Sequence, residues 1–530
     1  MPLTGHMNGN ILEKVEDTAV VSKKFGKRDI AVALLCAIVI VAAVALAGHG
    51  IISVLPCMVA LLLCVFARKA AIIAVVTAFA AAAAMYFSFD PGAGWADLNG
   101  NGIILRALAL AMSYFGVRLL SLAGADKVVL QIILDNTQSR RGYLAAASLL
   151  SMVFSASPEL GCLISGSIFA KAGERLGVSR EKTAFLVNIS SVMLWCLIGI
   201  GIYADPLFEY VRMGLDIAGG QSVSAAEFLR TTIVFLYFPI CITVVLMMSV
   251  FKLRDTGGML KIEREQRKRC NVEQLKNIYK SETDRGEVGM VVVPLLLDVL
   301  AMLGTIAAGL ETDVSMLISS GIFLISVTAS VLAKRGIRIL IGVLSIKINR
   351  ILPIMLISAL IIRFILTGPA PFSLVGIVIN ENLPLWLLPL ITIIVSALIA
   401  LVSGNAIIAM ALVLPSAIPA SWLASEQAIY YTMATASAIS GALAGQLCAP
   451  HAITSVISAC ACGCSMRTHL KTQVPYVLLS LGISCLFGYL PISLGLTAPF
   501  GLLCSIMGSY ALFETISKSP DTRSRKKDDN

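Results

Sequence analysis

The sequence predicts an all-α integral membrane protein with about 12 transmembrane helices. Of its 530 residues, 58% are apolar and 14% are charged, against roughly 45–50% and about 25% in soluble domains. Apolar runs of about 20 residues, the length that crosses a bilayer, recur along the whole chain. This apolar content, with the 13 cysteines spread over several hundred residues, excludes disordered, collagenous and disulfide-dense secreted proteins.

The transmembrane helices are predicted from apolar runs that are long enough to span. They are Ile30–Ala47, Ile51–Ala67, Ala70–Phe89, Gly102–Ala123, Thr183–Tyr203, Leu229–Phe251, Val288–Leu310, Val314–Leu332, Ile351–Thr367, Gln427–Leu447, Gln473–Leu490 and Gly495–Phe513. The hydrophilic stretch Met1–Asp29 precedes the first run, and no signal-peptidase motif follows that run. We therefore expect a retained cytoplasmic tail in place of a signal peptide.

Two further apolar stretches do not fit as ordinary spans. Tyr143–Ala170 is interrupted at Ser155-Ala156-Ser157-Pro158, which leaves two arms shorter than a span requires. Leu385–Leu423 is interrupted at Ser403-Gly404-Asn405, and its longer arms are compatible with full spans as well. Each stretch is predicted to be a re-entrant or broken-helix hairpin.

The distribution of basic residues supports the hairpins. Of the 41 lysines and arginines, all but five fall on one side of this topology, as the positive-inside rule requires of a cytoplasmic side. The five others are Arg106, Arg118, Arg212, Arg230 and Arg363. Counting Tyr143–Ala170 as one full span would break this pattern. The net charge of +10 is thereby explained by topology, and no nucleic-acid partner is expected.

The two hairpins occupy corresponding positions in two halves of opposite orientation. Such matched broken segments are typical of secondary transporters, which bind substrate near the bilayer midplane at the breaks. The alternative for each single break is a simple helix kink. The predicted organisation is a cytoplasmic tail (1–29), a first half (30–251, hairpin 143–170), a charged linker (252–287), a second half (288–513, hairpin 385–423) and a basic tail (514–530).

Two segments carry a family resemblance. The first is Leu176-Gly177-Val178-Ser179-Arg180-Glu181-Lys182-Thr183-Ala184-Phe185. The second runs from Gly445-Gln446-Leu447-Cys448-Ala449-Pro450 through Thr454, Ser458, Gly463-Cys464 and His469 to Lys471-Thr472-Gln473-Val474-Pro475-Tyr476. Both are similar to segments of the NhaC-type sodium/proton antiporters, and the resemblance extends from about Ala107 to Leu490. It implies an antiporter that exchanges Na⁺ for H⁺.

The chain departs from that family pattern at its acidic residues. Where the family has a pair of aspartates in the first hairpin, this chain has Ser157 and Pro158, and a third aspartate is replaced by Asn188. Two more in the second half are replaced by Gln446 and Ile453. Exchange at one site needs a group that is charged with the cation bound and neutral when protonated. The replacements do not titrate in the relevant range.

The candidate ion-binding residues lie at the two breaks and in the helices that follow them. They are Ser155, Ser157, Glu159, Asn188, Ser190, Asp298, Ser403, Asn405, Gln446 and Thr454. Neutral oxygens suit a hard cation. Glu159 and Asp298 are the two remaining membrane carboxyls, and either is a candidate for a displaced coupling acid. The alternatives are that Glu159 faces a water-filled mouth and that Asp298 pairs structurally with an arginine such as Arg363.

Other polar residues give weaker indications. Arg106 and Arg363 suit either an anionic substrate or snorkelling to the interface. Cys460, Cys462 and Cys464 alternate, a spacing unlike that of zinc sites. Two of them could bind a soft metal, but small apolar residues in buried helices are the favoured interpretation. The histidines His6, His49, His451 and His469 suggest no metal cluster, although His451 is a candidate pH sensor. Motifs of hydrolases and nucleotide-binding enzymes are absent from the sequence.

We therefore expect a non-enzymatic secondary transporter without a cofactor, whose partners are Na⁺, H⁺ and the lipid bilayer. We expect it in the cytoplasmic (inner) membrane with both termini cytoplasmic, and a homodimer is one compatible assembly. The lost aspartates leave two alternatives open. One is an ion-coupled transporter of a different organic or anionic solute, and the other is a transport-inactive membrane scaffold or regulator.

Overall fold

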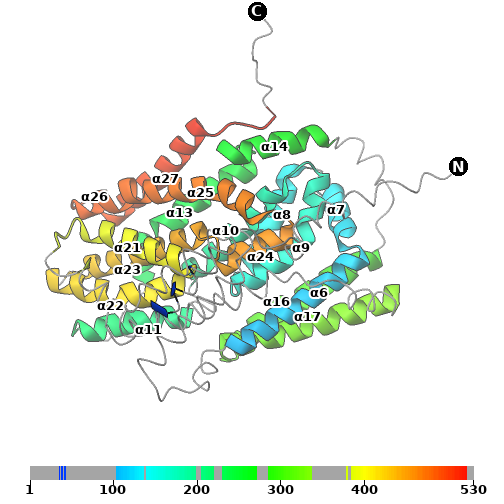
Figure 1. The fold of residues 1–530 in the computed structure, drawn as a ribbon, viewed down its shortest axis with the longest axis horizontal. Helices are drawn as coiled ribbons and strands as arrows, with labels where there is room; N and C mark the ends of the chain where they lie inside the picture. Colours follow the sequence, from blue (N-terminus) through cyan, green and yellow to red (C-terminus); the bar gives the residue numbers. More distant parts are fainter. Residues whose placement is uncertain are drawn as a thin grey trace, which may run out of the picture. The chain divides into compact units, whose positions relative to one another are not determined.

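The computed structural model describes residues 103–136, 139–198, 204–219, 230–270, 285–336, 383–425 and 427–521, with a few isolated positions elsewhere. The chain divides into two units, Met1–Pro91 and Gly92–Asn530, and the elements below all belong to the second. Within the described ranges the regular elements are helices (Figure 1), accompanied by one antiparallel bridge between Asp255 and Lys518. The all-α prediction is confirmed for this part of the chain.

Five described helical segments are long and apolar enough to cross a membrane. They are Glu287–Ala307, Thr312–Lys334, Ala406–Ala424, Met466–Ser493 and Ala498–Ile516, and the bent pair Ala428–Cys448 with Ile453–Cys462 makes a sixth. A multi-pass membrane protein is therefore confirmed. The predicted spans Ile30–Ala47, Ile51–Ala67, Ala70–Phe89 and Ile351–Thr367 lie wholly or almost wholly outside the described residues.

Helices α6 (Ile103–Ala123), α16 (Arg285–Ala307) and α17 (Thr312–Arg335) pack side by side, with α17 against both others (Figure 1). Arg106 of α6 forms a forked ion pair with Asp313 of α17. Ser113 Oγ donates to Ser320 Oγ over 2.9 Å. A Cβ at Gly116 would lie 2.8 Å from the Phe323 ring, so this glycine admits the aromatic side chain between the helices.

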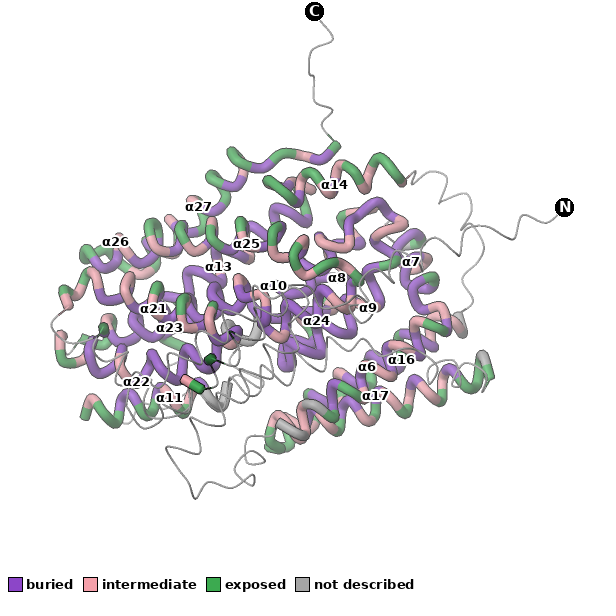
Figure 2. Tube along the Cα trace, in the orientation of Figure 1, coloured by how far each residue is buried: buried purple, intermediate pink, exposed green. Residues whose placement is uncertain are grey.

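Both predicted hairpins are pairs of helices that break where the sequence indicates. The first consists of α8 (Arg140–Val153) and α9 (Pro158–Arg175), and both pack on α10 (Arg180–Ile198). The second consists of α21 (Leu388–Ser403) and α22 (Ala406–Ala424), and both pack on α23 (Ala428–Cys448). Helices α9 and α22 are buried over most of their length (Figure 2). The second helix of each hairpin, which begins at the break, thus lies inside protein, where irregular backbone is tolerated at membrane depth.

The second break follows from local backbone chemistry. Gly404 adopts a left-handed conformation with φ of +68°, which glycine reaches without the steric penalty of a Cβ. Asn405 then caps α22, because its Oδ1 accepts from the Ile407 N–H at 2.8 Å. The first break carries Ser157 before Pro158, and the proline occupies the first turn of α9, where its missing N–H costs nothing.

Several predicted bounds need correction. Leu229–Phe251 is not one regular span, since a short 3₁₀ turn (Ile233–Phe235) ends at Phe235. After the non-helical Leu236, α13 begins at Tyr237 and ends at Phe251. Gln473–Leu490 begins earlier as α25 (Met466–Ile483) and continues through a π-helical turn (Ser484–Tyr489) into α26 (Leu490–Ser493). Gly495–Phe513 corresponds to α27 (Ala498–Ile516).

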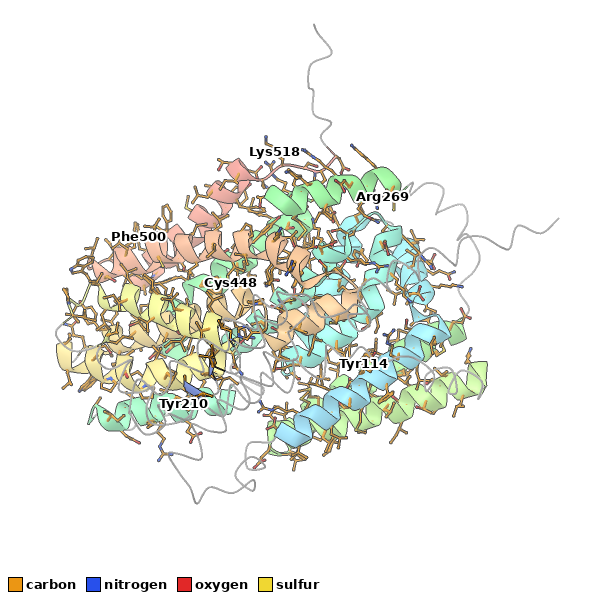
Figure 3. All side chains as sticks on the ribbon, in the orientation of Figure 1. Tyr114, Tyr210, Arg269, Cys448, Phe500 and Lys518 are labelled. Atoms are coloured by element: carbon orange, nitrogen blue, oxygen red, sulfur yellow. The ribbon has the colours of Figure 1, made fainter. Side chains whose placement is uncertain are left out.

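Four helices were missed or only partly predicted from the sequence. They are α7 (Ala125–Asn136), α11 (Ala204–Ile217), α14 (Gly257–Arg269) and α24 (Ile453–Cys462). Helix α14 lies in the charged linker, and the segment after α27 runs beside it, because Asp255 and Lys518 exchange both backbone hydrogen bonds at 3.0 and 2.9 Å. The labels of Lys518 and Arg269 in Figure 3 mark this neighbourhood.

Candidate functional site

The first break places three predicted residues inside the protein. Ser155, Ser157 and Glu159 are all buried. Ser157 Oγ lies 3.4 Å from the Met316 sulfur of α17, so this break contacts the layer of α6, α16 and α17. Glu159 stands in the first turn of α9, where the positive end of the helix dipole favours a carboxylate.

Asn188 joins the two halves. Its Nδ2 donates to Ser455 Oγ of α24 and to Gln473 Oε1 of α25, both at 3.1 Å. Gln473 Nε2 in turn donates to the Leu447 carbonyl at 2.7 Å. The family resemblance implies an aspartate at position 188. Here the position holds an amide that donates to a second buried amide, and neither group is charged. We call Asn188 and Gln473 the amide pair.

The second break brings the other predicted residues together. Gln446 Oε1 accepts from the Ala406 N–H at 2.8 Å, at the start of α22. Gln446 Nε2 reaches Thr454 Oγ1 at 3.4 Å. Ser403 Oγ accepts from the Asn405 N–H at 3.3 Å. These four side chains satisfy the backbone and one another at the break, so in this conformation their oxygens are largely occupied.

Buried oxygens without a hydrogen-bond partner among the described residues occur in both halves. On α9 and α10, the helices next to the first break, they are Ser165 Oγ, Asn188 Oδ1 and Ser190 Oγ, and the three residues have no solvent-exposed surface. Buried polar atoms are nearly always hydrogen-bonded, and oxygens are what a hard cation binds. Ser165 was missed at the sequence level, since a serine among small apolar residues carries no signal of its own.

Asp298 is fully buried in α16, and neither carboxylate oxygen has a hydrogen-bond partner in the described part of the chain. The side chain of Ser319 on α17 lies close to it, and one turn earlier on α17 the Ser315 hydroxyl is also unsatisfied. Asp298 thus belongs to the layer of α6, α16 and α17, which reaches the first break through Met316 and Ser157. Arg363, its suggested partner, lies outside the described residues.

The remaining polar candidates have structural partners. Arg106 is held by Asp313, so neither snorkelling nor free anion binding describes it. His451 packs over the second break, because a Cβ at Gly404 would lie 2.5 Å from its ring, and its Nε2 lies 2.9 Å from the Val402 carbonyl. Among the described residues, no group of histidines, cysteines and carboxylates could hold a metal ion.

The charged residues of the segment Ser179–Lys182 connect the first half to the linker and the second half. Lys182 Nζ lies 2.7 Å from Asp255 Oδ2, with both side chains fully buried. Arg180 pairs with Glu174 and donates to the Gly463 carbonyl at the end of α24, at 3.2 Å. The Ser179 N–H donates to Glu263 Oε1 of α14 at 2.7 Å. This segment therefore has an architectural role.

Glu263, which accepts from the Ser179 N–H, is a second buried carboxylate beside Lys182, and its side chain has no solvent-exposed surface. Burial raises the pKa of the Glu263 carboxyl, and Lys182 opposes the shift. The Tyr476 hydroxyl donates to Asp255 Oδ1 at 3.3 Å, and Ser249 Oγ does so at 3.0 Å. Linker, first half and second half therefore meet in one buried ionic cluster, formed by Lys182, Asp255 and Glu263.

Apolar spanning helices, two hairpins of broken helices inside the protein, and buried oxygens beside one of the breaks define a secondary transporter. Comparison with known proteins agrees. The chain belongs to the Na⁺/H⁺ antiporter family, whose model matches residues 206–491, and the resemblance noted in the sequence is thereby confirmed.

A relative from Haemophilus influenzae (strain ATCC 51907 / DSM 11121 / KW20 / Rd), described as an uncharacterized protein, is 22% identical over 410 residues, covering 72% of this chain and 76% of its own length. The family match includes the second break, Gln446, Thr454 and the amide partner Gln473. The first hairpin and Asn188 lie before residue 206, outside the matched range.

Proposed function

We propose that this chain exchanges a monovalent cation, Na⁺ in the first instance, for protons by alternating access, and that the cation binds between the first break and α10. The observation that carries the proposal is the set of buried, unsatisfied oxygens of Ser165, Asn188 and Ser190. Helices α9 and α10 that bear them pack directly on each other. A dehydrated Na⁺ would supply a partner for such oxygens. Asn188 and Ser190 are two residues apart and point to different faces of α10, so one of them would share the ion with Ser165.

Glu159 is the proposed source of negative charge for that cation. A cation bound only by neutral oxygens inside a low-dielectric protein would carry an uncompensated charge, which is costly. Glu159 starts α9, while Ser165 lies on the same helix two turns further on. Asp298 is the second candidate acid, because its carboxylate is fully buried and lies in the layer that contacts the first break.

The wider organisation belongs to the same proposal. Each half contributes a hairpin whose helices pack on the helix that follows, α10 in the first half and α23 in the second. An inverted arrangement of these halves, with about 12 spans in all, gives the two-fold site at the midplane that alternating access uses. Both termini are proposed to be cytoplasmic, in the inner membrane, because basic residues gather on that side. The domain bounds given above and a homodimer are part of this proposal.

The test is the collapse of a preformed proton gradient in everted vesicles on addition of Na⁺, Li⁺ or K⁺. Wild type is expected to collapse the gradient with at least one cation, and Glu159→Gln to abolish the collapse while reaching the membrane in equal amount. Glu209→Gln is the matched control, since Glu209 is exposed on α11. A silent wild type would overturn the exchange function, whereas full activity in Glu159→Gln would remove Glu159 from the site.

A further inference from the structure

A fully buried histidine lies close to the amide pair. His469, in the first half of α25, has no solvent-exposed surface. Its Nε2 lies 3.4 Å from Ser458 Oγ of α24, and its Nδ1 has no hydrogen-bond partner in the part of the chain that the structure describes. A buried ring nitrogen without a hydrogen-bond partner costs free energy.

The helix register places this imidazole one turn from the amide pair. Ser455, which accepts from Asn188, precedes Ser458 by three residues on α24. His469 precedes Gln473 by four residues on α25. Residues three and four apart lie on one face of a helix. Both helices therefore set His469 one turn from the amide pair, toward the turn at Gly463 that Arg180 contacts.

The charged groups on the surrounding elements are largely committed to one another. Helix α25 packs on α10, α13, α14, α23, α24 and α27. The ion pairs at this end are Lys182 with Asp255, Arg180 with Glu174, Lys252 and Arg254 with Glu514, and Arg267 with Glu263 and Asp521. The other titratable groups include Glu181, Cys448, Cys462 and Tyr476, with Lys261, Arg264 and Glu265 on α14 and Arg467 and Lys471 on α25 itself. Within the ranges that the structure describes, the ion pairs named above do not include His469.

The second buried histidine makes an instructive contrast. His451 Nδ1 also has no hydrogen-bond partner among the described residues, but its other ring nitrogen is hydrogen-bonded to the Val402 carbonyl, and its ring fills the space left by Gly404. Closing the second break accounts for His451. His469 has no comparable backbone partner, and it is the histidine that adjoins Asn188 through α24 and α25.

We propose that His469 is the proton-binding group of the exchange cycle. The unprotonated ring nitrogen of the neutral imidazole takes one proton from water, and the imidazolium later returns it to water, with no other bond made or broken. An imidazolium one turn from Asn188 repels a cation held by the oxygens beside it, because like charges interact strongly inside protein. Cation and proton then occupy the site in alternation. This inference rests on the proposed function, and it identifies the residue that binds the exchanged proton.

The charge balance follows. With Glu159 ionised, a site that holds one Na⁺ and a neutral His469 has the same net charge as a site that holds imidazolium and no cation. Both loaded forms reorient without moving net charge through the membrane. The exchange is therefore expected to be one cation for one proton, and its rate to be independent of membrane potential.

The first test compares the apparent KM for Na⁺ across about pH 4 to 8 in everted vesicles, a range that extends to acid pH because burial disfavours the charged imidazolium. In wild type this KM is expected to rise as the pH falls, by up to about tenfold per pH unit when one proton competes. In His469→Gln it is expected to change less than about twofold over that range, with the rate at saturating Na⁺ retained at high pH. Lys471→Gln, at an exposed position on the same helix, serves as the control that keeps the wild-type slope.

Two further measurements cover failure of His469→Gln to fold. Ser458→Ala keeps the histidine and removes its hydroxyl partner, so the midpoint of the pH dependence is expected to shift, which a purely structural histidine would not cause. Clamping the membrane potential in wild-type vesicles is expected to leave the rate unchanged. A wild-type pH slope in folded His469→Gln, or a potential-driven wild-type rate, would overturn the assignment of the proton. A wild type without exchange at any pH would instead overturn the proposed function.

Discussion

Lys182 and Asp255 form an ion pair, with 2.7 Å between Nζ and Oδ2, at a point where neither side chain has any solvent-exposed surface. Lys182 lies in the first turn of α10, which carries Asn188, and Asp255 lies two residues before the linker helix α14. Tyr476 of α25 donates to the same aspartate. The pair therefore holds the helix with the candidate ion ligand against the linker and the second half.

Removing one partner of this pair is expected to be strongly destabilising. Lys182→Met leaves the Asp255 carboxylate buried without its counter-ion, and breaking a buried pair in this way costs about 3–5 kcal/mol. We expect a large fall in the melting temperature of the purified protein in detergent. The double variant Lys182→Met/Asp255→Leu removes both charges and should regain most of the loss. A single variant as stable as wild type would contradict the structural role of the pair.

Glu263 gives the ionic cluster a pH dependence with a defined sign. Because burial raises the pKa of Glu263 in the folded protein, the folded state binds this proton more tightly than the unfolded state. The stabilisation is fully present below the unfolded value of about 4.3 and is lost as the pH rises through the raised folded pKa.

Glu263→Gln tests that sign, because the amide oxygen still accepts from the Ser179 N–H but carries no charge. Melting temperatures measured from pH 4 to 9 should fall more steeply for wild type than for the variant. The variant should gain relative to wild type toward alkaline pH. Parallel curves for the two proteins would show that Glu263 is ionised in the folded state with no penalty.

Hydropathy predicted the helices whose faces lie against lipid or apolar protein, and it failed where charged residues are paired inside. Helix α10 begins at Arg180, before the predicted Thr183, because Lys182 lies buried against Asp255. Helix α11 was missed because Glu209, Arg212 and Asp216, all on its exposed face, break up the apolar run along the sequence. Its buried face carries Gly214, which packs against Ile418 of α22.

The parts of the site that depend on neighbouring residues in the sequence were predictable, and the parts that depend on tertiary contacts were not. Gly404 and Asn405 mark a helix break through backbone preference alone. The contact of Asn188 with Gln473 joins residues 285 positions apart, and the unsatisfied Ser165 hydroxyl depends on how α9 packs. Neither has a pattern along the chain, so only the tertiary structure supplies them.

Close packing of the second hairpin depends on two glycines of α23. A Cβ at Gly445 would collide with the Ala397 carbonyl oxygen of α21, and one at Gly441 with that of Ile393. Small residues at such positions let two helix backbones approach each other. Gly445→Val is therefore expected to force α21 away and destabilise the protein by about 1–3 kcal/mol or more.

The control for this substitution is Gly304→Val on α16, where an added Cβ meets nothing within 4 Å. Both variants place a β-branched residue in a helix, so only the collision distinguishes them. Melting temperature and yield of monodisperse protein are the measurements. Equal losses in the two variants would show that the approach of α21 to α23 is not what Gly445 provides.

Restoring two of the acids that the family resemblance implies should strengthen the dependence on Na⁺. Asn188→Asp converts the unsatisfied oxygen beside Ser190 into a carboxylate, to which the Ser455 hydroxyl can donate in place of accepting. Ile453→Asp adds a second carboxylate in the first turn of α24, where the helix dipole stabilises it. Added negative charge at an oxygen site raises affinity for a hard cation.

We expect the double variant to lower the apparent KM for Na⁺ by about tenfold, the change that 1.4 kcal/mol of added binding free energy produces. The matched control is Asn188→Asp with Ile453→Asn, which has nearly the same shape at residue 453 but lacks its charge. Gradient collapse measured against Na⁺ concentration separates the two. If the folded double variant behaves as wild type, the cation does not bind beside Asn188, and the layer of α16 and α17 around Asp298 becomes the place to look.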